Sequence, residues 1–165
     1  VRFQRKSTGN GRRGLMEGPG RLLSFRRLAA FGFSLNLVWE MVQCGVLYDM
    51  WGWSAWDAAA VMIGAILADV VIVLVVVFGA AAIAGAERLN PPSFPGLLAL
   101  LAVGLPISVI IEWIPRSFGW WGYGPRMPTI EVAGQTLGLS PILQVTLLPA
   151  LSLFFATIQD RRTRT

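Results

Sequence analysis

Residues 58–86 read AAAVMIGAILADVVIVLVVVFGAAAIAGA, an apolar run interrupted by one charged side chain, Asp69. A bilayer core about 30 Å thick is crossed by about 20 apolar residues in a helix, so this run is long enough to span a membrane. Its valine-rich part, Val70 to Phe78, has β propensity, but a membrane barrel would need many alternating segments of roughly ten residues. The run therefore predicts a membrane-spanning helix, and it decides the fold class.

Three further apolar segments, at about 28–48, 96–114 and 141–159, meet the same length requirement. Helix starts are indicated by Ser54 and Asp57 before the second span, and by the pair Ser140–Pro141 before the fourth. The sequence thus predicts an all-α fold, an integral membrane four-helix bundle over 28–159. The remaining parts are a basic N-terminal arm over 1–27, an outer loop over 115–140 and a basic C-terminal tail over 160–165.

The composition excludes several classes of protein. Of the 165 residues, 55% are hydrophobic and 14% are charged, whereas soluble domains carry about 25% charged residues. An ordinary soluble enzyme, a disordered protein and a nucleic-acid-binding domain are therefore not expected, despite a net charge of +5. The chain has no histidine and one cysteine, Cys44, which removes disulfides and sites that depend on imidazole. We expect no cofactor held through histidine, so lipids, carotenoids or chlorophyll-type pigments could bind by apolar contact only.

The distribution of basic residues predicts the orientation. Twelve of the 14 lysine and arginine residues lie in the N-terminal arm, the C-terminal tail or the connection between the second and third spans. Four spans put these regions on one side, so the positive-inside rule predicts cytoplasmic N- and C-termini, in a bacterial inner membrane. We expect the first span to be an uncleaved anchor. The arm is expected to lie on anionic lipids rather than on nucleic acid.

Most of the tryptophans are placed as an interfacial aromatic belt would be, at the outer ends of spans or in outer loops. These residues are Trp51, Trp53, Trp56, Trp113, Trp120 and Trp121. In the outer loop, 130–139 is predicted to form a short hairpin or a re-entrant piece within a compact cap.

Polar side chains inside the predicted spans are the candidate site. Asn36, Glu40 and Gln43 share one helix face at 100° per residue. Asp69 lies at a similar depth in the second span, Glu112 near the outer end of the third and Gln144 in the first turn of the fourth.

Two interpretations of these polar residues stay open. One is a polar cavity that carries a proton or cation, or that binds a lipid headgroup. The other is interhelical hydrogen bonding that holds the bundle together, with Glu40 or Asp69 protonated. A metal site made by these two carboxylates is disfavoured, because the usual histidine ligands are missing.

Small residues recur at four-residue spacing in the second span, at Ala60, Gly64 and Ala68. Such a ridge lets another helix approach closely. It predicts either packing within the bundle or a docking face for a partner protein.

A set of motifs resembles a family of small bacterial multispanning membrane proteins that has no established activity. The motifs are Asn36-x-x-Trp39-Glu40, Glu112-Trp113, Trp121-x-Tyr123, Met127-Pro128, Gly138-Leu139-Ser140-Pro141-x-x-Gln144 and Leu148-Pro149. The resemblance implies a four-helix membrane fold and marks Glu40, Asp69, Glu112 and Gln144 as positions of interest. The family has a histidine and a Gly-Asp pair in its second helix. Here Ala68–Asp69 keeps the acid without the histidine, so a histidine-dependent chemistry would be absent.

These observations favour a non-catalytic accessory or scaffolding subunit of a larger bacterial membrane complex, with other membrane subunits as its partners. A photosynthetic reaction-centre or light-harvesting assembly is one candidate for that complex. Two alternatives remain: a small proton- or cation-coupled transporter or channel that uses the buried carboxyls, and a membrane-embedded enzyme acting on a lipid or isoprenoid.

Overall fold

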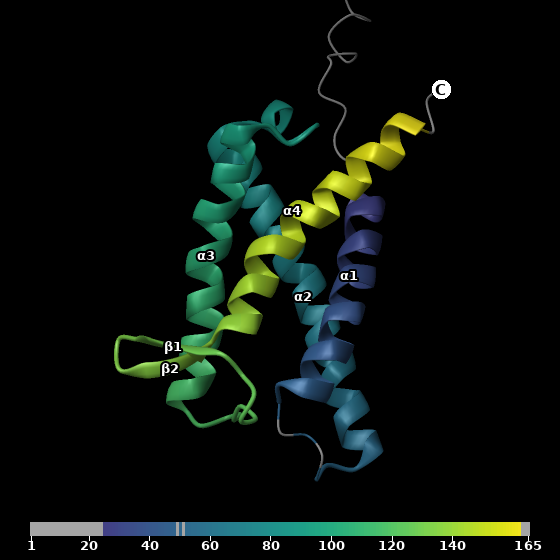
Figure 1. The fold of residues 1–165 in the computed structure, drawn as a ribbon. Coiled ribbons are helices and arrows are strands. Elements are labelled where there is room, and N and C mark those ends of the chain that lie inside the picture. The colour runs from purple at the N-terminus through teal and green to yellow at the C-terminus, as the bar shows by residue number, and fades with distance from the viewer. Residues whose placement is uncertain (1–24, 49, 51, 163–165) are drawn as a thin grey trace, which may run out of the picture.

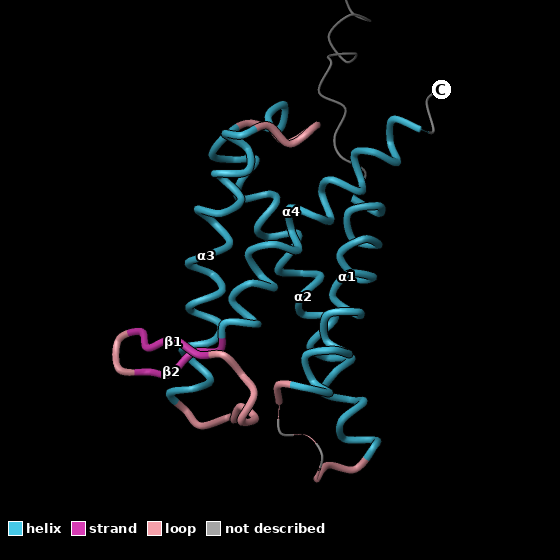
Figure 2. The backbone as a smooth tube through the Cα atoms, viewed as in Figure 1, coloured by secondary structure: helices cyan, strands magenta, loops and turns pink. Residues whose placement is uncertain are grey.

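The structure, a computed structural model, describes residues 25–48, 50 and 52–162. Within that part of the chain, helices α1 (Phe25–Val46), α2 (Ala55–Ala84), α3 (Phe94–Ser117) and α4 (Leu139–Arg162) form a bundle (Figure 1). A short 3-10 helix, η1 (Ala86–Arg88), follows α2, and a hairpin of β1 (Thr129–Val132) and β2 (Gln135–Gly138) precedes α4. Figure 2 shows that the loops lie at the two ends of the bundle. We call these the hairpin end and the termini end.

The four helices begin and end within a few residues of the predicted segments, and the fold is helical as expected. Three of them, α2, α3 and α4, are long and apolar enough to cross a membrane. Helix α1 was also predicted to span, but it falls outside that group because it carries Asn36, Glu40 and Gln43. The predicted basic arm lies outside the described residues except for its last three positions, as does Trp51.

The exposed and buried faces of α1 are reversed relative to a helix on a soluble protein. Asn36 is 1% exposed and Glu40 is 5% exposed, whereas Val38 and Met41 are 63% and 61% exposed. Long apolar side chains are exposed on the other helices too. In α2, only 22% of an apolar stretch of 18 residues is buried inside the chain. A surface of this kind is compatible with a multi-pass membrane protein, in which lipid covers the apolar faces.

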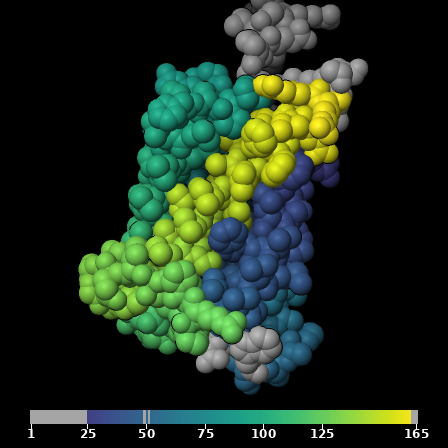
Figure 3. Space-filling model, viewed as in Figure 1, coloured from purple at the N-terminus to yellow at the C-terminus, as the bar shows by residue number. Residues whose placement is uncertain are grey.

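The apolar core lies toward the termini end. Leu28 of α1, Val76 and Ala80 of α2, Leu100 of α3 and Leu153 of α4 are buried together there. Closer to the hairpin end, α3 and α4 approach closely at Gly104, where an added Cβ would meet the Val145 carbonyl oxygen at 3.2 Å. The space-filling view shows α4 lying diagonally across this face between α3 and α1 (Figure 3).

An ion pair joins α1 and α4 at the termini end. The guanidinium of Arg27 contacts the carboxylate of Asp160 across 133 positions of sequence. The sequence placed Arg27 in the basic arm and Asp160 in the C-terminal tail, but both residues belong to helices. The contact therefore joins the first turn of α1 to the last turn of α4.

The hairpin end is closed by a cap, which we define as residues 118–138. The predicted hairpin forms, with Thr129 paired to Gly138 and Val132 paired to Gln135 around a two-residue turn. The cap is bound to the end of α1, because the Gly124 amide donates to the Leu47 carbonyl at 2.8 Å. Figure 3 shows the hairpin projecting from the side of the bundle.

The two predicted helix starts have different outcomes. Ser54 caps α2 as expected, since its hydroxyl accepts from the Asp57 amide at 3.1 Å. Ser140 does not precede α4, because that helix begins at Leu139 and the serine is buried in its first turn. Its hydroxyl instead donates to the side chain of Gln43 at 2.5 Å.

Candidate functional site: a polar pocket at the hairpin end

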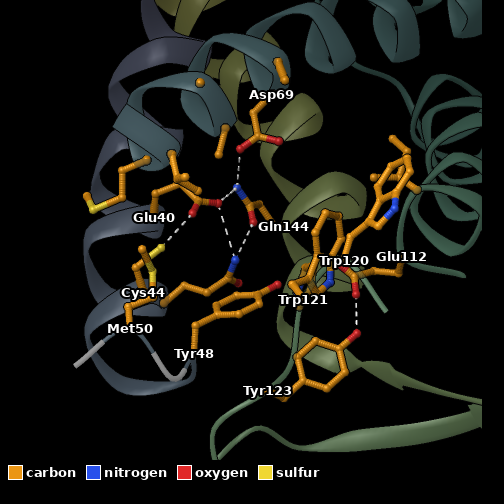
Figure 4. Close-up of a pocket in the computed structure, with 18 of the residues that line it drawn as sticks. Glu40, Cys44, Tyr48, Met50, Asp69, Glu112, Trp120, Trp121, Tyr123 and Gln144 are labelled. Carbon is orange, nitrogen blue, oxygen red and sulfur yellow. Dashed lines mark hydrogen bonds between the residues drawn. The ribbon is translucent and has the colours of Figure 1, made fainter. Parts of the chain in front are cut away.

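A pocket of about 910 Å³ opens within the half of the bundle nearest the hairpin end. All four helices and the cap contribute to its lining, as the close-up shows (Figure 4). Before Ile66 the side chains of α2 are half-buried or exposed, and Met62, Gly64 and Ala65 are among those that line the pocket. A volume of this size lies within the range of small-molecule sites, roughly 300–1,000 Å³.

The floor of the pocket is organised by Gln144 of α4. Its side-chain nitrogen lies 2.8 Å from Glu40 of α1, 2.7 Å from Asp69 of α2 and 3.0 Å from Asn36 of α1. Figure 4 shows both carboxyls pointing at this one nitrogen. Five of the six polar residues singled out in the sequence therefore meet here, counting Gln43. We call Glu40 and Asp69 the carboxyl pair.

The direction of the amide groups follows from their other partners. Gln43 accepts at its side-chain oxygen from the Trp39 indole at 3.0 Å and from the Ser140 hydroxyl. Its nitrogen then donates to the Gln144 oxygen at 3.3 Å, which turns the Gln144 nitrogen toward the carboxyl pair. The two amides are thus aligned in series, and such chains polarise one another in a medium of low dielectric.

The donors that reach the carboxyl pair are all neutral groups. The two hydrogens of the Gln144 nitrogen face three oxygens, and the Gln43 nitrogen lies 3.4 Å from one of these, the Glu40 oxygen. The second Glu40 oxygen accepts from the Cys44 thiol at 3.3 Å, a weak donor. A buried negative charge without a positive partner is costly. A proton held by the carboxyl pair, or a positively charged donor on a bound molecule, would supply what these neutral groups cannot.

The opposite wall holds the sixth predicted residue, Glu112 of α3. It accepts a hydrogen bond from the Tyr123 hydroxyl, which in turn accepts from the Gly138 amide at 2.9 Å. The Arg116 guanidinium lies 4.8 Å from the centre of the Tyr123 ring and donates to the Trp121 carbonyl at 2.6 Å. This wall therefore binds the cap to α3, and it keeps Glu112 apart from the carboxyl pair (Figure 4).

Two tyrosines beyond the helix ends remain neutral over the physiological range. Burial, together with the nearby Glu112 carboxyl, raises the pKa of Tyr48 and of Tyr123. Their rings contact each other with centroids 5.8 Å apart. Tyr123 thus acts as a neutral hydrogen-bond donor to Glu112.

The predicted ridge of Ala60, Gly64 and Ala68 is exposed, and nothing lies within 4 Å of a Cβ added at Gly64. The prediction that it packs within the bundle is therefore wrong. Gly64 and Ala68 instead line the pocket beside Val61, whereas Ala60 lies outside it. Because these lining residues are exposed, they mark an opening along the flank of α2.

The predicted tryptophan belt gathers at the hairpin end, where Trp53, Trp56 and Trp120 are exposed and Trp113 and Trp121 are half-buried. Trp53, Trp120 and Trp121 also line the pocket. Among the described residues, no group of three or more metal-ligating side chains comes together.

Sequence reasoning missed several residues of this site. Cys44 could have been found, because it follows Glu40 by four residues and so shares its helix face. Ser140 was expected to cap a helix, and its contact with Gln43, 97 positions away, has no signal in the local sequence. Arg116 was not among the predicted site residues. Comparison of the chain with protein-family models, with curated proteins and with solved structures found no match.

Proposed function

We propose that this chain is a multi-pass membrane protein that binds an amphiphilic molecule in the pocket at its hairpin end. The observation that carries the proposal is the combination of a polar floor, deep in the helices, with an opening along the apolar flank of α2. A molecule with a polar head and an apolar chain fits both parts at once. Its head would meet the Gln144 floor, and its chain would extend past Gly64 into the surrounding lipid.

The orientation that accompanies this proposal puts the hairpin end outside the cytoplasm. The support is the excess of lysine and arginine in the sequence before α1 and around its start, around the end of α4, and between α2 and α3. The pocket would then take its ligand from the outer leaflet of a bacterial inner membrane.

The single cysteine of the chain provides a direct test, because Cys44 lines the pocket. The full chain in dodecyl maltoside is reacted with N-ethylmaleimide in the presence of decanol, decylammonium or decanoate. We expect at least one of these amphiphiles to slow alkylation severalfold. Quenching of the pocket tryptophans by bromodecanol is a second readout. The proposal fails if no amphiphile slows alkylation and bromodecanol quenches no more than in the variant described next.

Gly64→Phe and Ala60→Phe form a matched pair for this test. Both sites are exposed on α2 one turn apart, but only Gly64 lines the pocket. A phenylalanine at Gly64 would occupy the opening, so we expect it to abolish protection by the amphiphile. Ala60→Phe should leave protection unchanged.

An accessory role in a larger membrane complex is the second candidate, and the exposed ridge favours it. A helix face of small residues suits close contact with a helix of another membrane subunit. Ala60→Phe should then release the chain from a larger complex extracted in mild detergent, while leaving ligand protection intact. If wild type and Ala60→Phe elute at the same size, this candidate is overturned.

A further inference from the structure

The side chains that line the pocket include more acidic than basic groups, which bears on the kind of molecule that the pocket binds. Among the described lining residues, Glu40, Asp69 and Glu112 are acidic and Arg116 is the basic residue. The guanidinium of Arg116 is engaged at the rim with the Trp121 carbonyl and the Tyr123 ring. It is therefore not the counter-ion of the carboxyl pair on the floor.

The aromatic side chains that line the pocket also favour a cation. Tyr48, Trp53, Trp120, Trp121 and Tyr123 all border the pocket. The faces of tryptophan and tyrosine rings attract cations, by about 0.5–2 kcal/mol at each favourable contact. An anionic head would meet these aromatic residues and the acids together, so it is disfavoured there and at the floor.

The floor points in the same direction, because the donors that reach the carboxyl pair are neutral. Glu40 and Gln144 are at least 95% buried, and Glu40 meets the amide nitrogens of Gln144 and Gln43 and the Cys44 thiol. A ligand that brings N–H donors and a positive charge would supply the charge that these groups lack.

We propose that the ligand is a lipophilic alkylammonium cation, and that it replaces a proton held by the Glu40–Asp69 pair. This inference rests on the proposed function, because it names the class of amphiphile that enters the same pocket. The exchange is balanced: one proton leaves the carboxyl pair for the solvent, and one ammonium charge takes its place. No covalent bond between heavy atoms changes.

The other charged or titratable groups around the pair are few. Helix α1 contributes Cys44 and, past its end, Tyr48; α3 contributes Glu112 and Arg116; the cap contributes Tyr123. Helix α4 presents the neutral Gln144 amide. The acids of α1 and α2 are thus the pair whose shared proton a cation can displace most directly.

The test is calorimetric titration of the full chain in dodecyl maltoside with decylammonium, decanol and decanoate. We expect decylammonium to bind at least tenfold more tightly than decanol, and decanoate to bind least. Titration in two buffers of different ionisation enthalpy should count about one proton released for each cation. Because one proton is released for each cation bound, the Kd for decylammonium should fall as the pH is raised, by up to about tenfold per pH unit.

Asp69→Asn and Asp57→Asn are the matched variants, since both acids lie on α2 and only Asp69 borders the pocket. Asp69→Asn should abolish proton release and flatten the pH dependence, whereas Asp57→Asn should behave as wild type. Equal binding of decanol and decylammonium, or cation binding with no proton released by wild type, would overturn the inference while leaving amphiphile binding standing. Binding of none of the three would instead remove the proposed function itself.

Discussion

The side-chain nitrogen of Gln144 in α4 lies 2.7 Å from the carboxyl of Asp69 in α2, joining two helices that are 75 residues apart in sequence. The same nitrogen lies 2.8 Å from Glu40 in α1. One neutral amide therefore holds two acids from two helices at the floor of the pocket. In an apolar environment, such a contact is favoured because the alternative is a buried polar group without a partner.

We expect Gln144→Leu to lower the free energy of unfolding by about 1–3 kcal/mol, because it removes the one amide that donates to both members of the carboxyl pair. Thermal unfolding in detergent measures the change. Leu143→Ala is the control, since Leu143 is the neighbouring residue and is exposed. Loss of the same size in both variants would mean that Gln144 contributes apolar packing rather than hydrogen bonds.

Some features of this site follow from local sequence. The alignment of Asn36, Glu40 and Gln43 needs only the 100° rotation per residue of a helix, and all three are buried on one face of α1. The hydrogen bond from the Asp57 amide to the Ser54 hydroxyl at the start of α2 is likewise local, because it joins residues three positions apart.

Other features depend on how the helices meet, which no local pattern encodes. Gly64 is exposed because no other part of the chain packs against it, which depends on how α2 crosses the bundle rather than on its own sequence. The contact of Ser140 with Gln43 exists because α4 begins two residues earlier than its serine-proline signal indicates. The pairing of Arg27 with Asp160 depends on the relative lengths of α1 and α4.

Tyr123 predicts a pH dependence of stability in the alkaline range. Its pKa is raised in the folded chain, first by burial and then by its hydrogen bond to Glu112. A raised folded pKa means that the contribution to stability is complete below the unfolded value of about 10 and is lost as pH rises above it. Denaturant unfolding above about pH 10 should therefore show a steeper decline in wild type than in Tyr123→Phe.

The Tyr123→Phe variant also separates the hydroxyl from the ring. It removes the bonds to Glu112 and Gly138 while keeping the ring that contacts Tyr48. We expect faster hydrogen exchange at the Gly138 amide, because that donor loses its acceptor. Unchanged exchange there would show that the hairpin is fixed to the bundle by other contacts.

Two glycines of the cap region test how tightly it is packed. A Cβ at Gly138 would lie 3.1 Å from the Tyr123 ring and 3.2 Å from Pro141, whereas a Cβ at Gly122 would meet nothing within 4 Å. Gly138→Ala should lower the free energy of unfolding by about 1–3 kcal/mol through overpacking. Gly122→Ala should change it by less than about 1 kcal/mol. Chemical denaturation of both variants gives the comparison, and equal effects would contradict a tight contact at Gly138.

The contact between Arg27 and Asp160 predicts a favourable coupling between the first turn of α1 and the last turn of α4. Asp160 is 12% exposed at its side chain and Arg27 is 33% exposed, so solvent screens the pair only in part. A double-mutant cycle with Arg27→Gln and Asp160→Asn should return a coupling energy of about 0.5–1 kcal/mol, smaller at high salt. Both substitutions remove a charge, and the cycle cancels the effect that each has outside the pair. Additive effects of the two substitutions at low salt would show that the ends of α1 and α4 are joined by apolar contacts alone.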